Sequence, residues 1–224
     1  MRAVFAVLLL GCAGAAPKPV PPPVAPKVTP ATDDRSGFAQ ADFGVVRSDR
    51  FGVSLPLPDR AQWTIADRDD QNGGWMVATH PGTGTIVRAR RFAETTLVGR
   101  HECEMRAQLV GALPKNEAIE DGHYTTLVDE PLHRPKGWDG RRWVAFEPRP
   151  GGKLGGHVVL VAGKQHACLV VQVITEVKGD LDSEALADRL ELFSSRTIGG
   201  VTADSAKEPE PILPAPPVKG MINP

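Results

Sequence analysis

Two short stretches of the sequence gather side chains that could bind a metal ion. The first, DRDDQNGG at residues 67–74, offers carboxylate and amide oxygens in a glycine-containing loop, which suits a hard cation such as calcium. It departs from the calcium-loop pattern, because Asn72 stands where the glycine belongs and Ala78 where the bidentate glutamate belongs. The second, HECE at residues 101–104, is not followed by another His or Cys cluster, although zinc needs three or four converging ligands. We therefore expect no metal site and interpret the first stretch as a polar turn.

Motifs for covalent catalysis or nucleotide binding are absent from the sequence. Ser36, Ser48 and Ser54 lack the G-x-S-x-G frame of a nucleophile elbow, and the six histidines are scattered. The glycine pairs at 151–152 and 155–156 lead into an expected strand, whereas phosphate-binding loops lead into a helix. We predict no catalytic residue and no cofactor. A hydrolase whose Ser, His and carboxylate meet only on folding remains an alternative.

The first cysteine, Cys12, directly follows an apolar run. Arg2 and the apolar residues 3–10 read as an export signal, and eight residues are too few for a membrane-spanning helix, which needs about 20. The letters LLGC at Leu9 to Cys12 resemble the bacterial lipoprotein signal, in which the cysteine becomes the lipidated N-terminus. An ordinary secretory signal cut after Ala15 is the alternative. The signal is shorter than the usual range of about 15 to 30 residues, which leaves an upstream start codon open.

This resemblance implies a lipid-anchored protein of the bacterial cell envelope. Residues 1–11 are then the signal peptide, and the Pro- and Ala-rich residues 12–32 are an extended linker between the acylated Cys12 and the folded domain. Ala13 after the cysteine resembles the pattern of proteins passed to the outer membrane rather than retained at the inner one. We expect the domain in the periplasm or at the cell surface.

Lipidation of Cys12 would leave Cys103 and Cys168 as an even pair in an oxidising compartment. A disulfide between them is the prediction, and two buried thiols are the alternative. Binding residues are less clearly marked. Tryptophans in expected loops, Trp63 and Trp138, and a basic strand that contains Arg88 and Arg90 are candidates for ligand binding. Lys and Arg number 26 against 27 Asp and Glu, so net charge gives no drive toward nucleic acid.

The hydrophobic pattern between residues 33 and 200 alternates between strand and helix periods, which predicts one α+β domain. We expect a largely antiparallel sheet of about six or seven strands with two main helices packed on it. The helices are predicted over 96–113 and around Leu186, Leu190 and Phe193, and Asp139-Gly140 is predicted as a hairpin turn. The expected strands are 51–55, 75–80, 85–92, 124–129, 142–147, 157–162 and 167–177.

The stretch FGVSLPLPDRAQW, which begins at Phe51, followed by this order of elements, resembles the PsbP-like α/β/α sandwich over about residues 51–198. Members of that fold are mostly binding or assembly factors, which implies a non-enzyme, although a fold does not give a function.

We expect residues 201–224 to form a disordered Pro-rich tail. The sequence favours a monomeric, lipid-anchored domain that binds an envelope protein or a small ligand without catalysis. A membrane-anchored hydrolase and a structural tether built on the proline segments are the alternatives.

Overall fold

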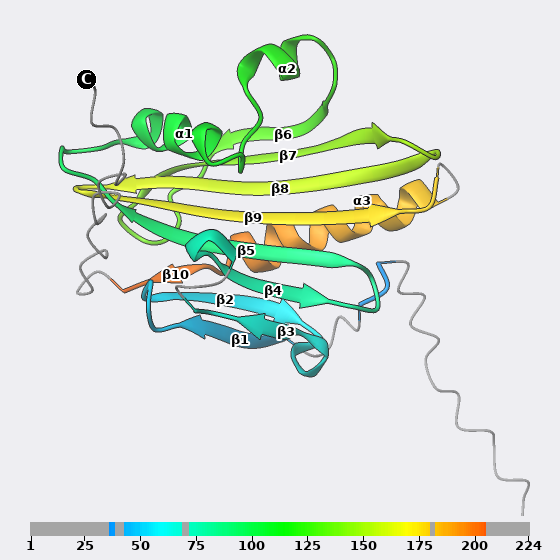
Figure 1. The fold of residues 1–224 in the computed structure, drawn as a ribbon, viewed down its shortest axis with the longest axis horizontal. Coiled ribbons are helices and arrows are strands. Elements are labelled where there is room, and N and C mark those ends of the chain that lie inside the picture. Colours follow the sequence, from blue (N-terminus) through cyan, green and yellow to red (C-terminus); the bar gives the residue numbers. More distant parts are fainter. Residues whose placement is uncertain (1–35, 39–42, 69–71, 180–181, 205–224) are drawn as a thin grey trace, which may run out of the picture. The chain divides into compact units, whose positions relative to one another are not determined.

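The computed structural model describes residues 36–38, 43–68, 72–179 and 182–204 (Figure 1). In this part of the chain the main sheet has seven strands, and every neighbouring pair is antiparallel. The predicted α+β class is therefore confirmed. The strand order is β3 (Thr64–Ala66), β4 (Met76–His80), β5 (Thr85–Ala93), β9 (Ala167–Val177), β8 (Lys153–Lys164), β7 (Asp139–Arg149) and β6 (Thr125–Pro131).

The central strands β8 and β9 are covered on both faces. On one face, residues such as Val158 and Val171 share a buried cluster with helix α3 (Ser183–Leu192). On the other face, Val159 and Val170 share a second cluster with helix α1 (Arg100–Leu109). Figure 1 shows the two helices on either side of these strands. Coverage of both faces explains why the two strands are nearly continuous apolar runs.

A second, three-stranded sheet packs on the α3 side. Its order is β1 (Phe43–Ser48), β2 (Val53–Pro58) and β10 (Thr202–Ala203), and its Leu55 and Leu57 belong to the same buried cluster as α3. β1 and β10 were not predicted. Because Val201 is buried and β10 pairs with β2, the folded region extends beyond residue 200, where the sequence predicted its end.

The first helical segment is shorter than the predicted 96–113. At its start, the Gly99 backbone N–H donates a hydrogen bond of 2.8 Å to the carboxylate of Glu102 in the first turn of α1. Beyond its end, Gly111 has a φ of 65°, which is outside the helical region. Helix α2 (Asn116–Glu120) comes next. Shorter helical turns complete the elements: 3-10 turns at Arg60–Gln62 and Asn72–Gly74, and a π-helical turn at Phe193–Ile198 that continues α3.

The predicted hairpin turn at Asp139-Gly140 is wrong. Both residues lie in β7, where they pair with Gly163 and Ala162 of β8, and residues 132–138 make the connection from β6. Gly140 is needed for close packing, because a Cβ atom there would lie 2.7 Å from the Leu132 carbonyl oxygen. The glycine therefore marks a close approach between backbones.

Cys103 of α1 and Cys168 of β9 form the predicted disulfide. Both residues are fully buried, so the bond fixes α1 to the sheet through the interior of the second cluster. In the described ranges, no helix is long and apolar enough to cross a membrane. Cys12, the predicted signal and linker, and residues 205–224 of the predicted tail lie outside the described residues.

Candidate functional site

The two tryptophans predicted in binding loops are buried, which corrects that expectation. Trp63 is 5% exposed, donates its indole N–H to the Pro58 carbonyl oxygen at 2.6 Å and stacks on Phe38. Trp138 is 2% exposed, and the Arg91 guanidinium lies 5.3 Å from its ring centroid. Both rings belong to the buried cluster on the α3 side, so their role is packing rather than presentation to a ligand.

The arginines predicted to bind a ligand contact the domain itself. Arg88 donates to the Gln172 side chain at 2.5 Å and to the Gly111 carbonyl oxygen at 2.8 Å. Arg90 donates to the Gly73 carbonyl oxygen at 2.7 Å. Both guanidinium groups therefore fasten loops to β5, and a ligand would have to compete with these contacts.

The metal-like stretches are also engaged. Asp67 pairs with Arg50 at 3.3 Å, and residues 69–71 of the first stretch lie outside the described part of the chain. In the second stretch, Cys103 is in the disulfide and Glu104 pairs with Arg141 at 3.3 Å. Among the residues that the structure describes, no group of three His, Cys, Asp or Glu side chains is placed to hold a metal ion.

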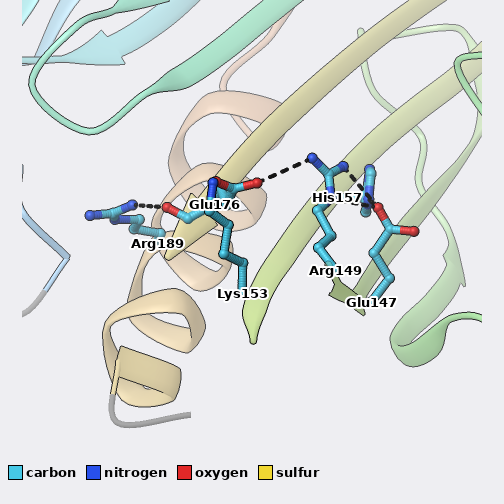
Figure 2. Close-up of polar contacts among 6 residues, drawn as sticks. All are labelled: Glu147, Arg149, Lys153, His157, Glu176 and Arg189. Carbon is cyan, nitrogen blue, oxygen red and sulfur yellow. Dashed lines mark hydrogen bonds and ion pairs between the residues drawn. The ribbon is translucent and has the colours of Figure 1, made fainter. Parts of the chain in front are cut away.

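Charged side chains from three neighbouring strands meet on the sheet face that carries α1 (Figure 2). We call Glu147, Arg149, Lys153, His157 and Glu176 the β7–β9 cluster. Arg149 donates to Glu147 at 2.8 and 2.9 Å and lies 3.6 Å from the Glu176 carboxylate. Lys153 donates to Glu176 at 2.7 Å. Two carboxylates thus face two cations, and the cluster neutralises its own charge.

His157 is the least exposed member of the cluster. Its side chain is 9% exposed and its Nε2 lies 3.0 Å from Glu147, whose ionised carboxylate accepts the hydrogen bond. Burial lowers the pKa of His157 below its ordinary value and outweighs the attraction of Glu147. For Glu147, burial acts to raise the pKa, but the hydrogen bonds from His157 and Arg149 outweigh it, so the pKa is lowered.

Gly155 allows Arg149 to lie across the sheet. A Cβ atom at Gly155 would lie 2.4 Å from Arg149 Nε, and the same glycine pairs with Glu147 on β7 and Glu176 on β9. The guanidinium therefore occupies the space above a residue without a side chain, between the two carboxylates. Correct pairing of β7, β8 and β9 in the sequence would have placed these charged residues side by side on one face. An error of one residue in that pairing would have placed each side chain on the other face.

The surroundings of His157 are a carboxylate and two aromatic rings. The ring of His157 contacts Glu147, Tyr124 and Trp143, and no serine or threonine hydroxyl hydrogen-bonds to it within the part of the chain that the structure describes. Arg189 of α3 joins the same region through the backbone, donating to the Glu176 carbonyl oxygen at 3.1 Å (Figure 2). The arrangement favours stabilisation of the strand ends over chemistry on a substrate.

Exposed apolar residues gather instead around α1. Leu109 is 80% exposed, Leu97 74% and Met105 48%. The helix faces the sheet with Cys103 and Ala107, so its larger apolar side chains point away from the core. The apolar spacing that predicted a helix over 96–113 therefore does not mark the buried face of α1.

A pocket of about 380 Å³ opens beside this helix face, and we call it the α1–α2 groove. Leu109 and Met105 are its apolar lining residues, and Lys115 and Glu117 are charged ones. A second hollow, about 370 Å³, is lined by charged residues including Arg100, Glu104 and Arg141. The full lining of the α1–α2 groove is Met105, Gln108, Leu109, Lys115, Asn116 and Glu117.

The chain resembles several solved structures in fold but matches no known protein in sequence. No family model and no curated protein matches the chain. Similar solved structures include a Bacteroides thetaiotaomicron protein, at TM-score 0.38 and 11% identity over 73% of this chain; the chain spans about half of it, 48%.

Two further structures align over most of their own length. LpqN of Mycobacterium tuberculosis, involved in cell envelope biogenesis, aligns at TM-score 0.41 and 14% identity over 72% of this chain and 90% of its own. Cyanobacterial PsbP (CyanoP) from Synechocystis aligns at TM-score 0.45 and 12% identity over 75% of this chain and 96% of its own. Because all three TM-scores are below 0.5, the α+β class rests on the strands and helices themselves, and the PsbP-like assignment stays a prediction.

Proposed function

We propose that this chain is a lipid-anchored protein of the bacterial cell envelope whose α+β domain binds a partner protein through the α1–α2 groove, without catalysis. The proposed anchor is lipid on Cys12, and the Pro- and Ala-rich residues 12–32 give the domain reach from the membrane. The proposed membrane is the outer one, with the domain in the periplasm or at the surface.

The observation that carries the proposal is the exposure of Leu109 and Met105 on α1 beside a pocket, with Leu97 exposed in the connection that precedes the helix. Single exposed apolar residues are common on soluble domains, but residues four apart on a helix present one continuous ridge. Such a ridge fits a protein partner, since full burial of a Leu or Met side chain contributes roughly 1.5–3 kcal/mol.

The nearby charged groups are less suited to carry binding. Glu104 pairs with both Arg100 and Arg141 at the second hollow, and the β7–β9 cluster is neutral as a whole. A ligand that bound any of these charged groups would first have to break an existing ion pair. The Leu109 side chain, by contrast, is exposed to water, and its burial against a partner would be favourable.

Cross-linked affinity capture from the cell's own envelope fraction tests the groove. The full chain, Leu109→Asp and the control Val45→Asp serve as bait, because Val45 is also exposed, at 64%, but lies on β1. We expect one stoichiometric protein with the full chain and Val45→Asp, and a recovery about tenfold or more lower with Leu109→Asp, since an unpaired buried charge opposes binding. Equal recovery with all three baits would contradict the proposed surface.

Membrane fractionation tests the anchor separately. Cys12→Ser should release the protein from membranes into the soluble envelope fraction, because the acyl chains would be lost. Retention of Cys12→Ser in the membrane fraction would refute lipidation as the means of attachment.

A further inference from the structure

We propose that the second hollow, between α1 and β6, binds a small zwitterion, that is, a molecule with one ammonium group and one carboxylate or phosphate group. α1 provides Arg100 and Glu104, β6 provides residues 129–131 and β7 provides Arg141. The volume of about 370 Å³ lies near the lower end of the range for ligand pockets, about 300–1,000 Å³, which favours a small ligand. This site shares no lining residue with the α1–α2 groove and is independent of the proposed function.

Arg100, on the α1 side of the hollow, can bind the anionic group of the ligand. Its side chain is 40% exposed, and its ion pair with Glu104 spans 3.6 Å, which is longer than the roughly 2.7–3.2 Å of a direct hydrogen bond. A guanidinium has five N–H donors in a planar fork that matches a carboxylate or a phosphate. Within the described part of the chain Arg100 makes this one long ion pair, so most of its donors remain for a ligand.

Asp129 and Glu130, on the β6 side of the hollow, can bind the ammonium group. Their side chains are 44% and 47% exposed. Arg141 donates two hydrogen bonds to Asp129, at 2.6 and 2.7 Å, which lower the pKa of Asp129, and Arg142 donates to Glu130. An ionised carboxylate can accept about four hydrogen bonds through its two oxygens. Both carboxylates can therefore accept from an ammonium group and keep their arginine partners.

The charge balance of the hollow favours a ligand that carries both charges. Its three carboxylates face three guanidinium groups, because Arg142, the partner of Glu130, adds to the two arginines of the lining. A ligand with a single charge would leave that charge without compensation, whereas a zwitterion preserves the balance. The ion pair that has to break is the long, exposed Arg100–Glu104 pair, and such surface pairs are weak. Glu104 then keeps Arg141 as a partner at 3.3 Å.

Arg141 holds the two sides of the hollow in place. Its guanidinium contacts Asp129 of β6 and Glu104 of α1, and its side chain is 20% exposed. The helix and the strand are therefore linked through one side chain of β7 before any ligand arrives. A site that is already formed loses less conformational freedom on binding, which favours recognition of a small molecule.

Titration of the purified full chain with small zwitterions, followed by NMR, tests the proposal. The probes are glycine, 4-aminobutyrate and 6-aminohexanoate, which carry the same two charges at three separations, and phosphoethanolamine, whose anionic group is a phosphate. We expect at least one probe to bind with a Kd of about 1 mM or below, and the single-charge analogues hexanoate and hexylamine to bind about tenfold more weakly or worse. Tighter binding of phosphoethanolamine would indicate a lipid headgroup as the source, and tighter binding of an amino acid would indicate an amino acid or a peptide. Absence of binding by every zwitterion, or equal binding by a single-charge analogue, would overturn the proposal.

Variants of the full chain locate the binding site. Arg100→Gln and Glu130→Gln should each weaken binding of the tightest probe about tenfold, because each removes one charged contact. Arg47→Gln is the matched control, since Arg47 is also an exposed arginine with a carboxylate partner but lies on β1. Leu109→Asp should bind the probe as the unchanged chain does, which separates this site from the α1–α2 groove. Melting temperatures must agree among the variants, and binding that neither Arg100→Gln nor Glu130→Gln weakens would place the ligand elsewhere and overturn the proposal.

Discussion

Removal of the disulfide is expected to lower the free energy of unfolding by about 4 kcal/mol. Cys103 and Cys168 are separated by 65 residues, and a cross-link that closes a loop of this size removes about 4 kcal/mol of loop entropy from the unfolded chain. The variant is the double substitution Cys103→Ala with Cys168→Ala. Because both residues are fully buried, alanine avoids new polar groups in the second cluster and leaves small voids that add modestly to the loss.

Urea unfolding of the wild type and the double variant measures this loss by linear extrapolation to water. In a domain of this size the loss corresponds to a decrease of about 8–16 °C in melting temperature. Wild type unfolded and refolded with a reducing agent is the control, since reduction removes the same constraint without changing the sequence. A difference below about 1 kcal/mol, or two titratable thiols in untreated denatured protein, would refute the reasoning.

Three other consequences can be measured. Gly155→Val should displace the Arg149 guanidinium from the sheet and lower the melting temperature by several degrees, whereas unchanged stability would mean that the side chain has another place to lie. Because burial lowers the pKa of His157, the folded state favours the neutral ring. The contribution of His157 to stability should therefore be constant above about pH 6.5 and fall as the pH drops below it, and His157→Gln should reduce the slope of acid unfolding curves in that range. Trp63→Ala should cost about 3–5 kcal/mol in urea unfolding, as expected for a core residue, while a loss below 1 kcal/mol would restore its surface interpretation.

The central strands and the disulfide were predictable because their signals are local or compositional. Residues 157–162 and 167–177 are apolar at almost every position, which requires cover on both faces and therefore a central place in the sheet. The disulfide was predicted from the even pair of cysteines that remains if Cys12 is lipidated and the domain is exported to an oxidising compartment. Neither inference needs knowledge of how distant elements pack.

The exposed face of α1 and the buried tryptophans could not be predicted in the same way. Helical spacing identifies which residues share a face, but tertiary packing decides which face is buried. Here small residues, Cys103 and Ala107, allow the helix to approach the sheet closely, so the face with Leu109 points outward. Trp63 follows a turn, but its position against Phe38 and Phe193 depends on elements distant in sequence.

The sheet face that carries α1 is divided between two kinds of surface. Inward positions of β7 change from Trp143 and Ala145 beneath the helix to Glu147 and Arg149 beyond it. The charged part satisfies its own ions, so a ligand there would exchange existing ion pairs for new ones and gain little net free energy. The apolar ridge of α1 has no such cost, because covering it releases water from hydrocarbon. Binding at the ridge should therefore depend weakly on ionic strength, whereas binding at the β7–β9 cluster would weaken as salt screens the charges.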